Sequence, residues 1–76
     1  MDIEELALIL RERYEKAKRN EASMEVHLFG IEYAEEIRES DYKVAELVEL
    51  AGISKGYAAE VSKGMKLASR VKITEE

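Results

Sequence analysis

Hydrophobic residues in the first part of the chain recur every third or fourth position, which is the spacing of one face of an α-helix. The residues on this face are Ile3, Leu6, Ala7, Leu10, Tyr14 and Ala17. Asp2 precedes them with Glu5 three positions later, which is the pattern of a capped helix start. The pattern therefore predicts a first helix from Ile3 to Lys18.

A second apolar pattern covers residues 24–39 and predicts a second helix there. Its inner face is expected to carry Leu28, Ile31, Ala34 (or Glu35) and Ile37 (or Arg38), with Met24 and Phe29 near its start. Gly30 interrupts this helix at a cost of about 1 kcal/mol relative to alanine. Either a close crossing with another helix or a break after Phe29 would explain the glycine.

A third helix is predicted from Tyr42 to Ala51, after the cap residues Ser40 and Asp41. Its inward residues are expected to be Val44, Leu47, Val48 and Ala51. The spacing of this set is again helical, and the run is short because a glycine follows Ala51 directly.

The segment Ala51-Gly52-Ile53-Ser54 is predicted to be a tight turn. Gly52 supplies the positive φ that ends a helix in such a turn. We expect Ile53 to be buried in the turn and Ser54 to cap a fourth helix, which runs to Lys63 and stops at Gly64. Beyond residue 65, Val71 and Ile73 alternate with Lys72, so the chain is expected to form a short strand or an extended tail.

These elements predict an all-α fold, a compact four-helix domain over residues 1–76 that contains a helix-turn-helix at about residues 43–64. The stretch from Leu47 to Gly64 resembles the helix-turn-helix of the Cro and phage-repressor family. The matching residues are Gly52, Ile53, Ser54, Lys55, Tyr57, Val61 and Gly64. Ser62 stands where that family usually has glutamate, and Val48 and Ala58 exchange the usual small and large residues at the helix crossing.

A wider resemblance covers most of the chain. The segment His27-Leu28-Phe29-Gly30-Ile31, the later Ala51-Gly52-Ile53, and Lys63-Gly64-Met65-Lys66-Leu67-Ala68 are similar to a group of small bacterial proteins known as HTH-like domain proteins. The resemblance implies the helix-turn-helix fold and says little about function.

Composition and candidate chemistry narrow the function. The 76 residues contain no cysteine and a single histidine, His27, so neither a thiolate metal site nor a histidine-based catalytic pair is expected. No glycine-rich phosphate loop is present. The chain has no apolar run long enough for a membrane span, and its first residues are acidic. We therefore expect a cytoplasmic protein that is not an enzyme and has no cofactor, metal or membrane partner.

The charge distribution is uneven along the chain. Residues 1–42 hold 12 acids and 6 bases, a net charge of −6, within a total of −5. Residues 52–73 hold five bases against Glu60 alone, a net charge of +4. A basic segment on an acidic body is typical of a nucleic-acid-binding face, although a solvated surface of uneven charge is the plainer explanation.

A DNA-binding helix-turn-helix places its second helix in the major groove. The residues expected to contact double-stranded DNA are Ser54, Lys55, Gly56, Tyr57, Ala59, Glu60, Lys63, Lys66 and Arg70. Lysines can contact guanine or phosphate, and a glutamate can accept a hydrogen bond from cytosine. Because this set offers few base-reading side chains, we expect a regulator of transcription with modest sequence specificity. The alternative is a helix-turn-helix that binds only proteins.

The segment Leu6-Ala7-Leu8-Ile9-Leu10 is apolar at five successive positions. One domain core covers only part of a helix, so Leu8 and Ile9 either meet other helices or lie on the surface. An exposed apolar patch on a small protein is a liability unless it is covered. We expect a symmetric homodimer with Leu8 and Ile9 in its interface, the alternative being a central first helix buried on several sides.

Overall fold

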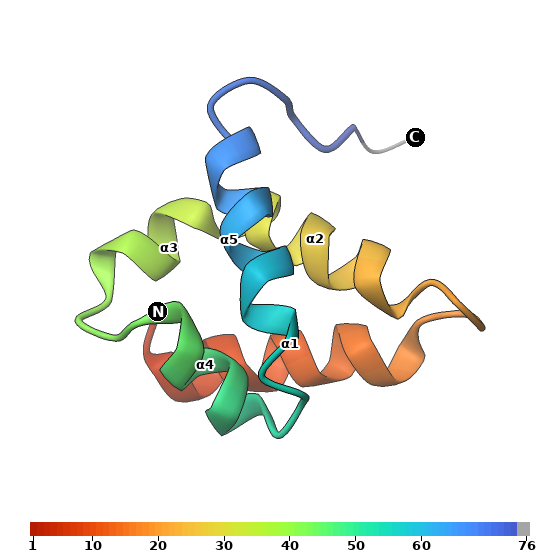
Figure 1. Ribbon diagram of the computed structural model, residues 1–76. Coiled ribbons are helices and arrows are strands. Elements are labelled where there is room, and N and C mark those ends of the chain that lie inside the picture. The colour runs from red at the N-terminus through yellow and green to blue at the C-terminus, as the bar shows by residue number, and fades with distance from the viewer. Residues whose placement is uncertain (75–76) are drawn as a thin grey trace.

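The structure of the chain, a computed structural model, describes residues 1–74, and these form five α-helices (Figure 1). The helices are α1 (Ile3–Lys16), α2 (Ala22–Glu32), α3 (Ala34–Glu39), α4 (Val44–Ala51) and α5 (Tyr57–Leu67). Helix α5 packs mainly against α2, while α1 contacts both α2 and α4. The all-α prediction is confirmed, with five helices in the described residues where four were predicted.

Helix α1 begins as its capping pattern predicts. The Asp2 carboxylate accepts a hydrogen bond from the backbone N–H of Glu5 at 2.9 Å. The helix ends at Lys16, two residues before the predicted end, because Ala17 adopts an extended backbone with ψ 141°. Its buried residues are Ile3, Leu6, Ala7 and Leu10, all members of the predicted inner face.

The prediction of one helix over residues 24–39 is wrong. The chain leaves helical geometry at Tyr33 (φ −109°, ψ 20°), which separates α2 from α3. No proline or glycine marks this break in the sequence. The Tyr33 ring instead packs on Phe29, with ring centroids 5.1 Å apart. The break between α2 and α3 is therefore accompanied by packing of the Tyr33 ring, which the helix propensities of the neighbouring residues do not predict.

The inner face of α2 is also displaced from the predicted one. Val26, Phe29 and Gly30 are buried, whereas Leu28 and Ile31 are half-buried and Met24 is exposed. Helix α2 is apolar on more than one side, so periodicity alone could not choose among its faces. The face that turns inward is the one that carries the glycine.

Gly30 lies at a close crossing of α2 and α5, which is one of its two predicted roles. A methyl group at Gly30 would collide with the backbone of Val61 and would lie 3.2 Å from the Gly64 Cα. A methyl group at Gly64 would collide with the His27 carbonyl and would lie 3.0 Å from the Gly30 Cα. The two backbones therefore touch at a point where only glycine fits.

This crossing overturns the prediction that Gly64 stops the last helix. Gly64 lies inside α5 and is buried, and the helix continues to Leu67. The residue lacks a side chain because α2 occupies that space, while its backbone stays helical. At Gly64 the absence of a Cβ allows close packing, whereas at Gly52 it allows the left-handed backbone of the turn.

Helix α4 and the turn after it follow the prediction closely. The helix begins at Val44, where the backbone N–H of Lys43 donates to the Glu46 carboxylate at 2.9 Å. It ends at Ala51, and Gly52 has the predicted left-handed backbone, with φ 77° and ψ 23°. The guanidinium of Arg11 donates to the Ala51 carbonyl at 3.2 Å, so α1 helps to cap the end of α4.

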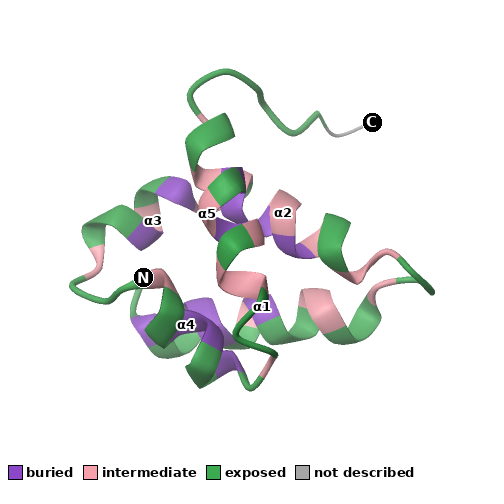
Figure 2. Ribbon diagram, viewed as in Figure 1, coloured by how far each residue is buried: buried purple, intermediate pink, exposed green. Residues whose placement is uncertain are grey.

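The core lies where α1, α2, α4 and α5 meet (Figure 2). Its largest fully buried side chains are Phe29, Leu6, Leu10, Leu47, Val26, Val48 and Val61. Helix α3 contributes Ala34 and Ile37. Ile53 packs against this core but is only half-buried, because the turn carries it at the margin of the domain.

The chain after α5 has no strand within the described residues. Backbone hydrogen bonds to the Leu67 carbonyl continue the turn as far as Val71, and residues 71–74 then run exposed without regular structure. The tail prediction is confirmed as far as residue 74, and residues 75–76 lie outside the described part. No helix within residues 1–74 has the length and apolarity that crossing a membrane requires.

The glycine crossing predicts a specific stability pattern. Gly30→Ala and Gly64→Ala should each destabilise the protein by about 1–3 kcal/mol, because the added methyl overpacks a backbone contact. Urea unfolding followed by circular dichroism measures the change. Gly56→Ala is the matched control: it adds the same methyl at φ −57°, 3.8 Å from the Ser54 hydroxyl, which is an ordinary contact, and should leave stability unchanged or raise it by about 0.4–1 kcal/mol. Equal effects at all three sites would contradict the crossing.

Candidate nucleic-acid interface

The residues predicted to contact DNA lie on α5 and on the segments at its two ends. Ala59, Lys63 and Lys66 are exposed on the helix itself. Ser54, Lys55 and Gly56 are exposed in the turn before it, and Arg70 is exposed in the turn after it. Lys63, Lys66 and Arg70 are spaced by three and four positions, so they lie on one side of the helix and its continuation.

The first turn of α5 differs from the prediction in detail. The helix begins at Tyr57, with Gly56 in the cap position, so Ser54 is not its N-cap residue. Ser54 still accepts two hydrogen bonds, from the N–H of Gly56 to its hydroxyl at 3.4 Å and from the N–H of Tyr57 to its carbonyl at 3.0 Å. The serine therefore orders the turn that leads into the helix.

Tyr57 connects α5 to α1. Its half-buried ring meets Tyr14 edge to face, with centroids 5.3 Å apart and an interplanar angle of 72°. Both tyrosines line an open hollow with Ser23, Ser54 and Glu60. The ring of Tyr57 is thus a packing element beside the proposed contact face.

Glu60 is the centre of a small polar cluster. His27 Nδ1 on α2 lies 3.5 Å from one carboxylate oxygen, and Lys63 Nζ donates to the other at 3.4 Å. The hydrogen bond with His27, and then the one with Lys63, lower the pKa of the Glu60 carboxyl below its ordinary value. Glu60 is therefore a carboxylate at neutral pH and offsets part of the positive charge of Lys63.

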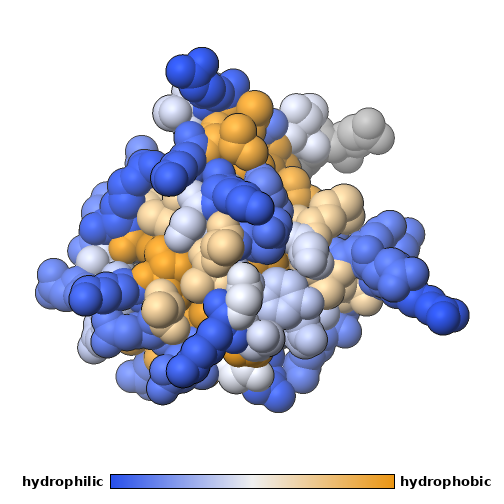
Figure 3. Space-filling model, in the orientation of Figure 1, coloured by the Kyte–Doolittle hydropathy of each residue, from blue (hydrophilic) through white to orange (hydrophobic). Residues whose placement is uncertain are grey.

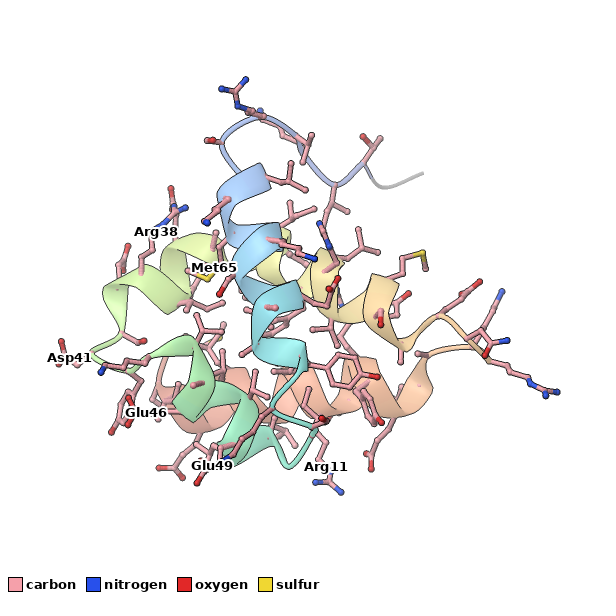
Figure 4. All side chains as sticks on the ribbon, viewed as in Figure 1. Arg11, Arg38, Asp41, Glu46, Glu49 and Met65 are labelled. Carbon is pink, nitrogen blue, oxygen red and sulfur yellow. The ribbon has the colours of Figure 1, made fainter. Side chains whose placement is uncertain are left out.

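Sequence reasoning did not assign His27 or Arg38 to this region. His27 is separated from Glu60 by 33 positions, and no local pattern joins them. The guanidinium of Arg38, on α3, donates to the Met65 carbonyl of α5 at 2.9 Å (Figure 4). The exposed arginine adds a positive charge beside the last turns of α5.

The basic residues of this region differ in their pairing. Within residues 1–74, Lys55, Lys66 and Arg70 take part in no ion pair, whereas Lys63 is paired with Glu60. Figure 3 shows polar side chains over much of this side of the molecule, with apolar atoms near the end of α5. The unpaired lysines and arginine can meet an anionic partner without first breaking an intramolecular contact.

Other kinds of site find little support in the described residues. Within residues 1–74, no group of three or more histidine, cysteine or acidic side chains is arranged to hold a metal ion. The hollows on the surface of this part of the chain are open and lined by few residues each.

Comparison with known proteins bears on the fold. The family described as HTH-like domain matches residues 2–74, nearly the whole chain. No curated protein and no solved structure matches the chain. The wider resemblance inferred from the sequence is confirmed, and the local resemblance to Cro and phage repressors stays a prediction.

The Glu60 cluster predicts a pH-dependent contribution to stability. Because the pKa of Glu60 is lower in the folded chain, its contribution is present above the unfolded value of 4.5 and is lost as pH falls through the folded value. The wild type should therefore lose more stability than Glu60→Gln when the pH is lowered from about 6 to about 3. Thermal unfolding at a series of pH values measures this.

The matched control for that series is Glu35→Gln, which removes an exposed carboxylate on α3 that has no ion pair within residues 1–74. Its acid sensitivity should stay close to that of the wild type. An acid response of Glu60→Gln that matches the wild type would contradict the cluster.

Proposed function

The chain belongs to the HTH-like domain family, and from the exposed face of α5 we propose that it binds double-stranded DNA as a regulator of transcription. Helices α4 and α5, joined by the turn at Gly52, are the two helices of the helix-turn-helix. In DNA-binding members of this class of motif, the second helix lies in the major groove. Helix α5 is the second helix of the motif in this chain.

The observation that carries the proposal is the alignment of Lys63, Lys66 and Arg70 on one exposed side of α5 and its continuation. Three positive charges along about 10 Å of helix, at 1.5 Å per residue, suit a row of phosphates. Lys55 adds a fourth at the other end of the helix. These contacts would supply affinity that does not depend on sequence.

Base reading by this face is limited. Gly56 and Ala59 offer no side-chain hydrogen bonds, and the Tyr57 ring is half-buried against Tyr14. Glu60 can accept from the amino group of cytosine, and Lys63 can donate to guanine, although each is also the other's partner at 3.4 Å. Specificity is therefore modest and relies partly on the shape of the duplex.

A second function, protein binding without DNA, is favoured by the surface of α4. Glu46 and Glu49 are exposed on this helix (Figure 4). The first helix of a DNA-bound helix-turn-helix crosses the phosphate backbone, where carboxylates would be repelled. The net charge of −5 acts in the same direction. Under this alternative the exposed faces of the scaffold serve protein partners.

A paired charge reversal separates these two functions. Lys55→Glu with Lys66→Glu removes two exposed cations that make no ion pair within residues 1–74. We expect the affinity for a random-sequence duplex to fall by about tenfold or more at low salt. Each phosphate contact releases counterions when it forms, so a variant with fewer contacts gains less from this release. Fluorescence anisotropy of a labelled duplex across a salt series gives both the affinity and its slope.

The matched control is Lys18→Glu with Arg19→Glu, which changes the net charge by the same amount in the exposed loop between α1 and α2. This variant should retain most of the affinity. If the wild type binds no duplex at low salt, or if both pairs weaken binding equally, α5 is not a DNA-binding helix and the protein-binding function takes its place.

A further inference from the structure

The side of the molecule formed by α1 and α4 exposes large apolar side chains. Leu8 is 59% exposed, Leu50 is 53% exposed and Tyr42 is 50% exposed. Leu50 separates two open hollows. One is lined by Ile3, Tyr42, Glu46 and Glu49, and the other by Glu4, Ala7, Leu8, Arg11 and Ala51, with Leu50 in both. We call this surface the α1/α4 face.

The rim of the α1/α4 face is acidic. Glu4, Glu46 and Glu49 border the two hollows, and none of them has an ion-pair partner within residues 1–74. Arg11 is the one cation that lines either hollow, and its guanidinium is already bound to Glu15 at 3.3 Å and to the Ala51 carbonyl. The face therefore suits a ligand with apolar side chains and positive charge.

The segment of residues 70–74, which we call the tail, has this character, and two glutamates follow it in the sequence. It reads Arg-Val-Lys-Ile-Thr, and Val71 and Ile73 are 42% and 37% exposed. In an extended conformation, alternate side chains point to opposite sides, so Val71 and Ile73 would share one side. The long side chains of Arg70 and Lys72 could then reach charges at the edge of whatever surface holds the two apolar residues.

We propose that the tail of a second copy of this chain binds the α1/α4 face, with Val71 and Ile73 in the two hollows beside Leu50 and the basic residues against the acidic rim. The two apolar side chains of the tail match the two hollows of the face in number. The positive charges of Arg70 and Lys72 are opposite to the negative charges of the rim. The tail leaves α5 on the side of the molecule away from α1 and α4 (Figure 1).

The chain's own tail cannot make this contact. Residues 71–74 span at most about 14 Å when fully extended, and they leave α5 at the end of the molecule opposite to α1 and α4, running away from both helices (Figure 1). The contact is therefore intermolecular. If two copies exchange tails about a two-fold axis, the assembly closes as a dimer.

This contact revises the interface expected from the sequence. Leu8 lies in the α1/α4 face, as the dimer prediction requires, but Ile9 is half-buried and packs against the core of its own chain. The alternative of a central first helix agrees with the packing of α1 against both α2 and α4, but it fails for Leu8, which is exposed.

The test is a mixing experiment on the full chain with two variants that disable one half of the contact each. Leu50→Glu alters the face, and Val71→Glu with Ile73→Glu alters the tail. Every substituted side chain is exposed, so each variant should fold, which circular dichroism checks. Sedimentation equilibrium should show that the wild type associates and that each variant associates at least about tenfold more weakly, the loss of about 1.4 kcal/mol.

Mixing identifies the geometry. The face variant keeps an intact tail and the tail variant keeps an intact face, so a mixture of the two should form a heterodimer at concentrations at which each variant alone is monomeric. Met24→Glu, at an exposed apolar residue on α2, is the matched control and should associate like the wild type.

Two results would overturn the proposal. A wild type that remains monomeric at high concentration has no such contact. A tail variant that associates like the wild type while the face variant does not would show that two α1/α4 faces bind each other. The experiment contains no DNA, so its outcome is independent of whether α5 binds a duplex.

Discussion

The backbone contact between α2 and α5 at Gly30 and Gly64 fixes the position of everything else on the candidate surface. Two glycines at one crossing bring the helices so close that neither can rotate or slide without a collision. Val61 is therefore held in the core, and Lys63 and Lys66 are held outward. The same crossing brings His27 of α2 within hydrogen-bonding distance of Glu60.

Features with a local cause could be predicted from the sequence, and features caused by long-range packing could not. The cap at Asp2 and the left-handed turn at Gly52 each depend on a few adjacent residues, and both are observed. Gly64 has the same identity as Gly52 but sits where another helix needs its space, so a prediction based on turn chemistry failed. The break at Tyr33 and the pairing of His27 with Glu60 likewise depend on contacts between distant segments.

In the folded chain, exposed positive and negative side chains of the helix-turn-helix lie on different helices. The exposed cations of α5 lie on one side of the helix-turn-helix, while the carboxylates of Glu46 and Glu49 lie on α4, its first helix. A single face cannot serve both an anionic duplex and a basic protein segment. Lys55, Lys63 and Lys66 lie outside the α1/α4 contact, so DNA binding by α5 is compatible with that association, while Arg70 can serve only one of the two partners at a time.

DNA binding by the exposed side of α5 is tested most directly residue by residue. Amide resonances of the ¹⁵N-labelled chain can be followed by NMR during titration with a short duplex at low salt. If α5 binds the duplex, the resonances of Lys55, Ala59, Lys63 and Lys66 should shift most, and they should revert when salt is added. Resonances that do not move, or shifts centred on the α1/α4 face, would contradict this binding.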